Sequence, residues 1–259
     1  MFEARGSLAL IKPELVNRVV LFGDIHGDFD SFEEGLTHWG EDDLLVLLGD
    51  YADRGPDGVE VIEKTAELME NYPDRVIALQ GNHEVYTEDG EPTFAPCTLI
   101  EEVRRKRGSW KQYWSFLSGF FSKLFLSALF PGHFLFVHGG IHSSITGVHD
   151  LESPRGKIFP SFFWSDPGDE PGERANMRGI GTVFGPDVSN TVLTSLGVTT
   201  LLRSHEPRKA RRGPAVQHGG RIITTSSTTI YGGKAFILTI DPDRPLSEPE
   251  NLENATHFL

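Results

Sequence analysis

The sequence contains almost no cysteine, which excludes one common way of stabilising a fold. Its 259 residues include a single cysteine, Cys97, so no disulfide can form within the chain. A chain of this kind suits a reducing compartment. The opening residues, Met1 to Leu15, lack the apolar stretch and the small-residue cleavage site of a secretory signal. Together these absences predict a cytoplasmic protein.

Long uninterrupted apolar runs are also absent. The most membrane-like segment, Trp110 to Phe130, is interrupted by Lys111, Gln112 and Lys123. Its large apolar side chains recur at helical spacing, as they do on one face of a helix that packs against a core. The segment therefore predicts a core-packing helix and not a membrane span.

An excess of positive charge is the third missing feature. The chain has 24 lysines and arginines against 37 aspartates and glutamates, a formal net charge of -13. Nucleic acids and anionic membranes are bound by basic surfaces, so neither is an expected partner. An anionic substrate would have to be held by local cations or by metal ions.

The chain does contain a repeated pattern, in which an apolar segment ends in glycine and a polar side chain. The segments that predict strands by this pattern are residues 18–27, 44–50, 75–82 and 133–140, and residues 199–205 predict one more strand without the glycine. Amphipathic helices are predicted after the first two, at residues 28–39 and 58–71. This alternation favours right-handed crossovers and a mainly parallel α/β sheet.

The remaining segments complete a single predicted domain over residues 1–259. Residues 150–178 are rich in proline, glycine and acidic side chains, and we expect a long functional loop there. Residues 221–227 and 234–240 are predicted to form the two strands of a hairpin that turns at Tyr231-Gly232-Gly233. The proline- and glutamate-rich tail from Asp241 is expected to lie loosely on the surface.

The predicted strands end in side chains that bind metals. In chain order these are Asp24 with His26, Asp50, Asn82 with His83, His138, and His205. The carboxyl ends of parallel strands share one edge of a sheet, where α/β proteins bind ligands. A lone histidine or asparagine at such a place is usually structural, but several together predict a site. Carboxylates, imidazoles and an amide without a thiolate suit Mn, Fe, Zn or Co. Two metals would need a shared anionic ligand, and Asp50 is central enough to bridge them.

The motifs around these residues carry a family resemblance. They are GDIHG at 23–27, GDYADRG at 49–55, GNHE at 81–84, HGG at 138–140, WSDP at 164–167, RGIGTVFGPD at 178–187 and RSHE at 203–206. In this order they resemble the phosphoprotein phosphatase family of serine/threonine phosphatases, in its compact prokaryotic or archaeal form. That family lies within the calcineurin-like metallophosphoesterase superfamily. RSHE stands where other branches of the superfamily have a GHxH motif.

The resemblance implies a fold and a cofactor. The fold would be a layered β-sheet sandwich flanked by helices, with two divalent metal ions at the carboxyl ends of the strands. One metal would be held by Asp24, His26 and Asp50, and the second by Asp50, Asn82, His138 and His205. Manganese is the metal expected in vitro, with iron or zinc as alternatives.

The resemblance also implies the reaction and the residues that perform it. Arg54 and Arg178 would clamp the phosphate, with Asn82 beside it and Tyr231 near the site. His83, paired with Asp53, would protonate the leaving alkoxide. The substrate would be a phosphoserine or phosphothreonine of a protein or peptide, attacked directly by a hydroxide that bridges the metals.

Some residues depart from the family pattern and leave other functions open. STTIY at 227–231 replaces a SAPNY-like segment, and His142 stands where serine is commoner. Hydrolysis of a dinucleoside polyphosphate, a preference for phosphotyrosine, and a non-catalytic phosphate-binding scaffold are the alternatives. The segment Arg208 to Arg212 is either a solvated loop or part of the rim of the site. Asp166 either tethers the loop of Arg178 or merely caps a turn, and the family match favours the tether. The sequence does not predict an oligomeric state.

Overall fold

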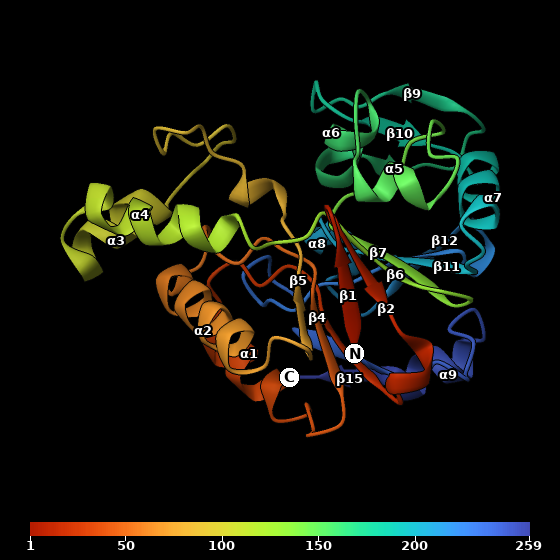
Figure 1. Ribbon diagram of the computed structural model, residues 1–259, viewed down its shortest axis with the longest axis horizontal. Coiled ribbons are helices and arrows are strands. Elements are labelled where there is room, and N and C mark those ends of the chain that lie inside the picture. Colours follow the sequence, from red (N-terminus) through yellow and green to blue (C-terminus); the bar gives the residue numbers. More distant parts are fainter.

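The computed structural model describes residues 1–259, which form two large β-sheets and one small sheet (Figure 1). In spatial order, the seven-stranded sheet consists of β1 (Phe2–Arg5), β2 (Leu8–Ile11), β6 (Ser127–Phe130), β7 (Phe134–Val137), β11 (Thr200–Arg203), β13 (Ile222–Thr224) and β12 (Ala215–Gln217). The five-stranded sheet consists of β15 (Thr256–Phe258), β14 (Phe236–Ile240), β3 (Val19–Phe22), β4 (Leu44–Leu47) and β5 (Val76–Ala78). The small sheet contains β8 (Asp166–Pro167), β10 (Thr182–Phe184) and β9 (Glu173–Ala175).

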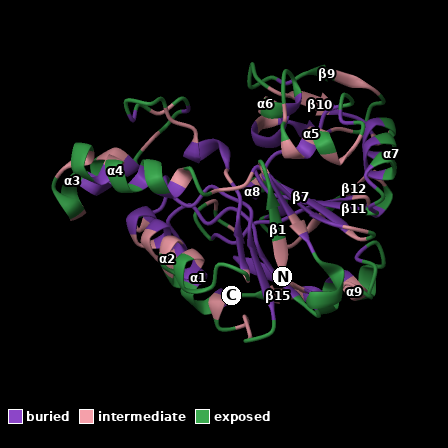
Figure 2. Ribbon diagram, viewed as in Figure 1, coloured by how far each residue is buried: buried purple, intermediate pink, exposed green.

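The two large sheets pack face to face and helices cover their outer faces. Alternate side chains of β4 show the arrangement: Leu44 and Val46 lie in the core between the sheets, whereas Leu45 and Leu47 pack toward the helices. The helices on the five-stranded sheet are α1 (Phe29–Leu36), α2 (Gly58–Asn71), α3 (Leu99–Arg107) and α4 (Trp110–Phe121). Those on the seven-stranded sheet are α5 (Val148–Glu152), α6 (Ile158–Trp164) and α7 (Pro186–Ser195). Figure 2 shows the central strands of the two large sheets buried and the outer faces of the helices exposed.

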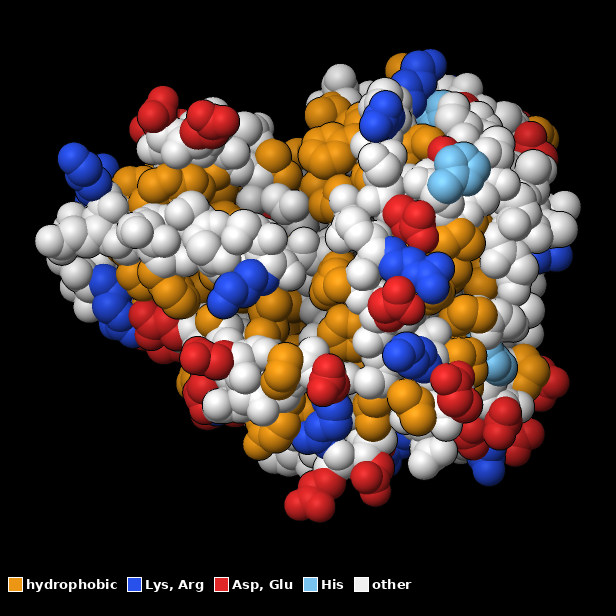
Figure 3. All heavy atoms as spheres, in the orientation of Figure 1, with side chains coloured by type: hydrophobic (Ala, Val, Ile, Leu, Met, Phe, Trp, Pro, Cys, Tyr) orange, Lys and Arg blue, Asp and Glu red, His pale blue; other side chains and the backbone are white.

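The remaining elements are short. They are α8 (Pro207–Ala210), α9 (Pro249–Ala255) and three 3₁₀ turns, η1 (Pro13–Leu15), η2 (Asn82–Glu84) and η3 (His218–Gly220). No helix combines the length and the apolar character that crossing a bilayer requires. In Figure 3 acidic and basic side chains are scattered among apolar ones, and the visible face is hollowed between the side of α3 and α4 and the side of α5 and α6.

The predicted layered α/β sandwich is confirmed, but the expected single, mainly parallel sheet is divided into two mixed ones. The triplets β3-β4-β5 and β7-β11-β13 are each parallel. The predicted hairpin of residues 221–227 and 234–240 is wrong, because β13 pairs with β11 and β12 while β14 pairs with β3 and β15. The segment between β13 and β14 crosses from one sheet to the other instead of closing a turn.

The tail does not lie loosely on the surface. It forms α9 and β15, and β15 adds an edge strand beside β14. Leu246, Leu252 and Ala255 are buried in the core between the sheets. Residues 150–178 are also more ordered than expected, since they contain most of α5 together with α6, β8 and β9.

Candidate metal centre

The loops that follow β3, β4, β5, β7 and β11 bring the predicted metal ligands together. All of them are buried, with exposed fractions of 0–6%: Asp24, His26, Asp50, Asn82, His138 and His205. They come from both large sheets, so the site lies where the carboxyl ends of the two parallel triplets meet. The predicted convergence of these residues is therefore observed.

The first ligand group consists of Asp24, His26 and Asp50. The His26 Nε2 atom lies 3.5 Å from Asp50 Oδ2 and 4.0 Å from Asp24 Oδ2. His26 Nδ1 is 2.9 Å from the carbonyl oxygen of Ala52, so Nδ1 carries the proton and donates it there. The lone pair of Nε2 is therefore turned toward the two carboxylates, which is the tautomer that a metal ligand needs.

The second group consists of Asp50, Asn82, His138 and His205. The Asn82 Oδ1 atom lies 3.0 Å from His138 Nε2 and 2.8 Å from His205 Nδ1. His138 Nε2 also lies 3.5 Å from Asp50 Oδ1. One carboxylate oxygen of Asp50 thus faces each group, which is the position of a bridging ligand.

The hydrogen bonds of the two groups are incomplete without a cation. His138 Nδ1 donates to the carbonyl oxygen of Leu48 at 2.9 Å, so Nε2 is an acceptor that faces another acceptor, Asn82 Oδ1. Buried polar atoms in folded proteins almost always have partners. Asp24 Oδ2 and His205 Nε2 are buried and have none. A divalent cation satisfies facing lone pairs and an orphaned carboxylate oxygen, so the residues present fit a metal site.

The electrostatics of the site favour the same conclusion. Burial, and then the neighbouring Asp24 and Glu84 carboxylates, raise the pKa of Asp50 well above its usual value. Burial lowers the pKa of His26 to about 3 and holds the pKa values of His138 and His205 well below the usual range. The imidazoles are therefore neutral, as ligands must be, while the clustered carboxylates lack a compensating cation.

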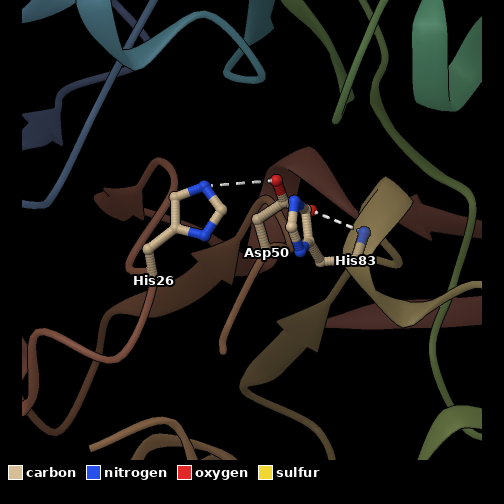
Figure 4. A group of neighbouring side chains, drawn as sticks. All are labelled: His26, Asp50 and His83. Atoms are coloured by element: carbon tan, nitrogen blue, oxygen red, sulfur yellow. Dashed lines mark hydrogen bonds and ion pairs between the residues drawn. The ribbon is translucent and has the colours of Figure 1, made fainter. Parts of the chain in front are cut away.

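His83 lies beside the first group. One ligand atom from each of His26, Asp50 and His83 lies within 4.8 Å of the other two. Figure 4 shows the two imidazoles on either side of Asp50, whose Oδ1 accepts the backbone N–H of His83 at 3.0 Å. The His83 Nδ1 atom is 2.7 Å from Asp53 Oδ2. The predicted His83–Asp53 pair is present, and only Nε2 of His83 remains free to act in the site.

The backbone of the site is strained. Six residues other than glycine have positive φ angles, and five of them lie in these loops: His26, Asp50, Asp53, Arg54 and His205, with values from 50° to 74°. Such conformations are uncommon for residues other than glycine and cluster at functional sites. The surrounding fold holds them in place to aim the side chains.

The two predicted phosphate-binding arginines differ in how they are held. Arg54 is exposed, and its backbone N–H donates to Thr98 Oγ1 at 3.1 Å. Arg178 donates from Nε to Asp166 Oδ2 at 3.1 Å, and its side chain is 41% exposed. The predicted tether by Asp166 is therefore observed. Tyr231 also lies near the site, as predicted, because its hydroxyl is 3.2 Å from His26 Nε2.

Three residues that hold the site together were not predicted. Glu84 accepts the backbone N–H groups of Asp50, Tyr51 and Gly81, and Arg203 is fully buried and ion-paired with Asp166. Asp28 accepts from the backbone and side chain of Thr229, two residues before Tyr231. Glu84 and Arg203 stand inside the motifs GNHE and RSHE, and that membership was the available signal.

Comparisons with known proteins place the chain in a family. The family model for calcineurin-like phosphoesterases matches residues 17–209. A Caenorhabditis elegans protein provisionally named a serine/threonine-protein phosphatase is 32% identical over 236 residues, which cover 85% of this chain and 49% of that protein. The chain thus spans about half the length of this relative.

Solved structures share the fold. A Saccharomyces cerevisiae protein serine/threonine phosphatase with similarity to human phosphatase PP5 has a TM-score of 0.77 at 23% identity, covering 93% of this chain and 78% of that one. A cold-active protein-tyrosine phosphatase of a psychrophilic Shewanella has a TM-score of 0.64 at 14% identity, covering 99% and 83%. A provisionally assigned diadenosine tetraphosphatase has a TM-score of 0.58 at 16% identity, covering 98% and 97%. With the match to the family model over most of the sequence, the chain belongs to the calcineurin-like metallophosphoesterases.

Proposed function

We propose that this chain is a metal-dependent phosphoprotein phosphatase that hydrolyses phosphoserine and phosphothreonine monoesters. The observation that carries the proposal is the His83–Asp53 pair at 2.7 Å beside the two ligand groups. Serine and threonine alkoxides are poor leaving groups, and a histidine oriented by a carboxylate supplies the proton they need. The provisional name of the Caenorhabditis elegans relative supports the same substrate class.

The residues that would hold the metals are those of the two groups. Asp24, His26 and Asp50 would hold one ion, and Asp50, Asn82, His138 and His205 the other. When bound, divalent metals at such a site lower the pKa of a bound water and neutralise charge on the phosphate. Manganese is the metal we expect to work in vitro, with iron or zinc as alternatives.

The arginines would bind the phosphate oxygens. No carboxylate forms an ion pair with Arg54, and Arg178 donates only its Nε–H to Asp166. Both guanidinium groups therefore keep planar pairs of N–H donors for a phosphate. Asp166 would fix the direction of Arg178, and the Arg203–Asp166 ion pair would fix Asp166.

His83 would deliver the proton to the departing oxygen. Asp53 accepts the hydrogen bond from Nδ1, so the proton to be transferred resides on Nε2. Asp53 also accepts the backbone N–H of Leu99 at 2.8 Å, which keeps its carboxylate in place. We expect water to take up the phosphoryl group directly, so that rapid quench during turnover traps no phosphorylated protein.

Steady-state hydrolysis by metal-stripped protein tests the proposal. Manganese is added back, and phosphate release is measured from a phosphoserine peptide and from a phosphotyrosine peptide. Cleavage of diadenosine tetraphosphate is measured in parallel. We expect manganese-dependent release that is fastest from the phosphoserine peptide. Asp50→Asn should lose this activity, whereas Asp42→Asn, an exposed acid outside the site, should keep it. A preference for the nucleotide or for phosphotyrosine would overturn the proposed substrate and leave the metal site standing.

A further inference from the structure

A basic pocket lies beside the candidate site. It is lined by Arg211, Arg212, Gly232, Gly233 and Lys234 and has a volume of about 680 Å³. Every side chain that lines this basic pocket carries a positive charge. The chain as a whole is strongly acidic, with a net charge of -13. A concentrated positive region on such a protein attracts anions locally.

The cations of the basic pocket have no acidic partners. On the same segment, Arg203 and Lys209 both pair with Glu206. Arg211, Arg212 and Lys234 form no ion pair, although all three are exposed and Lys234 packs over the ring of Phe258. Like charges held close together repel one another, so an anion bound among them is stabilised by all three.

The walls of the basic pocket are fixed by the backbone. The Lys234 N–H donates to the carbonyl oxygen of Arg211 at 3.0 Å. A Cβ atom added at Gly233 would lie 2.3 Å from that same oxygen, so only glycine allows the two segments to approach this closely. The Asp28 carboxylate anchors the preceding residues through Thr229. The basic pocket is therefore a built feature of the fold and not the gap beneath a loose loop.

Tyr231 connects the basic pocket to the metal centre. It directly precedes Gly232, and its hydroxyl lies 3.2 Å from His26 Nε2. The guanidinium carbon of Arg208 lies 5.9 Å from the centre of the Tyr231 ring. The pocket and the ligand groups are thus separated by about one tyrosine side chain, and Arg208 adds a further cation beside that tyrosine.

We infer that the basic pocket binds a second anionic group of the substrate, a phosphate or carboxylate on the same peptide as the scissile phosphoserine. This rests on the proposed function. The pocket offers cations and backbone but no apolar or aromatic side chain, so it suits an anionic group. An extended peptide advances about 3.3–3.6 Å per residue, so the second anion is expected within a few residues of the scissile one.

The test compares phosphoserine peptides with and without a second anion. One peptide has only the scissile phosphoserine, and a series adds a phosphonate analogue of phosphoserine, which cannot be hydrolysed, two to four residues away on either side. We expect kcat/KM for release of the scissile phosphate to be about tenfold higher at the best spacing, as charge-assisted contacts to several cations predict. The gain should appear mainly as a lower KM.

Two double variants with the same change in net charge locate the effect. Arg211→Glu with Lys234→Glu should abolish the preference for the second anion. Lys12→Glu with Lys123→Glu, two exposed cations that form no ion pair, should preserve it. Lys12 follows the carboxyl end of β2. Strand β2 is parallel to β6, and β6 is antiparallel to β7, so Lys12 lies at the edge of the sheet opposite to the site. Both variants should hydrolyse p-nitrophenyl phosphate, which has no second anion, within about twofold of the unchanged protein, because a folded site needs neither pair.

The outcomes separate this inference from the function on which it rests. Equal rates on the single-anion and two-anion peptides would overturn the inference and leave the phosphatase proposal intact. An equal loss of preference in both double variants would also overturn it, because the effect would then come from net charge. Hydrolysis of p-nitrophenyl phosphate with no release from any phosphopeptide would contradict the proposed function and the inference together.

Discussion

His83 is held on several sides at once. Its Nδ1 is bonded to Asp53, its backbone N–H donates to Asp50, and its ring centroid lies 4.4 Å from that of Phe94 and 5.0 Å from that of His26. These contacts leave the imidazole little freedom to rotate, so Nε2 points in one direction. A proton donor fixed in this way contributes most when the leaving group is a strong base.

Replacing His83 with asparagine should therefore affect substrates unequally. For a phosphoserine peptide, His83→Asn should lower kcat by about 100-fold or more, the usual contribution of a positioned general acid. For p-nitrophenyl phosphate, whose leaving group scarcely needs a proton, the loss should stay below about tenfold. Steady-state kinetics on both substrates measures the difference. Equal losses would remove His83 from the role of acid.

Asp166 acts through the arginines around it. Burial raises the pKa of its carboxyl, but Arg203, Asn176 and Arg178 outweigh this and hold the pKa below the usual value. Asp166→Asn should release Arg178 and raise KM for a phosphoserine peptide by about tenfold, with a smaller change in kcat.

A matched variant controls for this effect. Asp187 lies near the same sheet and accepts the backbone N–H of Gly172 at 2.8 Å, so Asp187→Asn should leave both constants nearly unchanged. A fall in kcat without a rise in KM in Asp166→Asn would contradict the positioning role.

At the scale of elements, Asp43 joins the end of the α1 segment to the start of β4. Its carboxylate accepts from Arg18 Nε at 2.9 Å and from the backbone N–H of Gly40 at 2.7 Å. Burial raises the pKa of Asp43, and the hydrogen bonds from Arg18 and Gly40 more than reverse this, so its folded pKa is lowered. A carboxyl whose pKa is lowered on folding stabilises the fold at any pH above its pKa in the unfolded chain, near 4. This stabilisation is lost as the pH falls through the pKa of the folded state.

Asp43→Asn should lower the free energy of unfolding by about 1–2 kcal/mol at pH 7, as expected for loss of hydrogen bonds to a charged group. Denaturant unfolding should show this difference shrinking as the pH falls below about 4. Asp42→Asn, at the exposed neighbouring position, should change stability by less than about 0.5 kcal/mol. A difference that stays constant from neutral to acid pH would contradict the role of the charge.

The final helix and strand contribute to the core and can be tested in the same way. Leu252 on α9 is 8% exposed and packs between the two sheets. Leu252→Ala should lower the free energy of unfolding by about 2–3 kcal/mol, through lost apolar burial and the cavity left behind. Leu15→Ala, at a leucine that is 51% exposed, is the control and should cost less than about 0.5 kcal/mol. Equal effects would mean that α9 adds little to the core.

At the scale of the whole molecule, the sequence predicted the site better than the sheets. The strand ends were readable because an apolar run that stops at a polar residue, usually beside glycine, is a local signal, and the candidate ligands followed from it. The division into two sheets has no such local signal in the sequence. Residues 221–227 and 234–240 have the pattern of neighbouring strands, yet β13 and β14 join partners far away in the chain.

The supporting residues were hidden for a different reason. An arginine or glutamate in a sequence is normally exposed, so a fully buried Arg203 and a Glu84 that collects three backbone N–H groups emerge only from the fold. The positive φ angles of His26 and Asp50 are equally invisible, because such positions are expected to be glycine. The tail was misread because its proline and glutamate content masked the buried Leu246 and Leu252.

The central claim is that the strand-end groups hold two divalent cations that share Asp50, and that hydrolysis depends on both. Titration of metal-stripped protein with manganese, recording bound manganese per chain and phosphate release from a phosphoserine peptide in the same samples, tests it most directly. The account predicts that two equivalents bind and that activity reaches its maximum only as the second is taken up. Full activity in metal-free protein, or binding that stops at one equivalent with full activity, would contradict it.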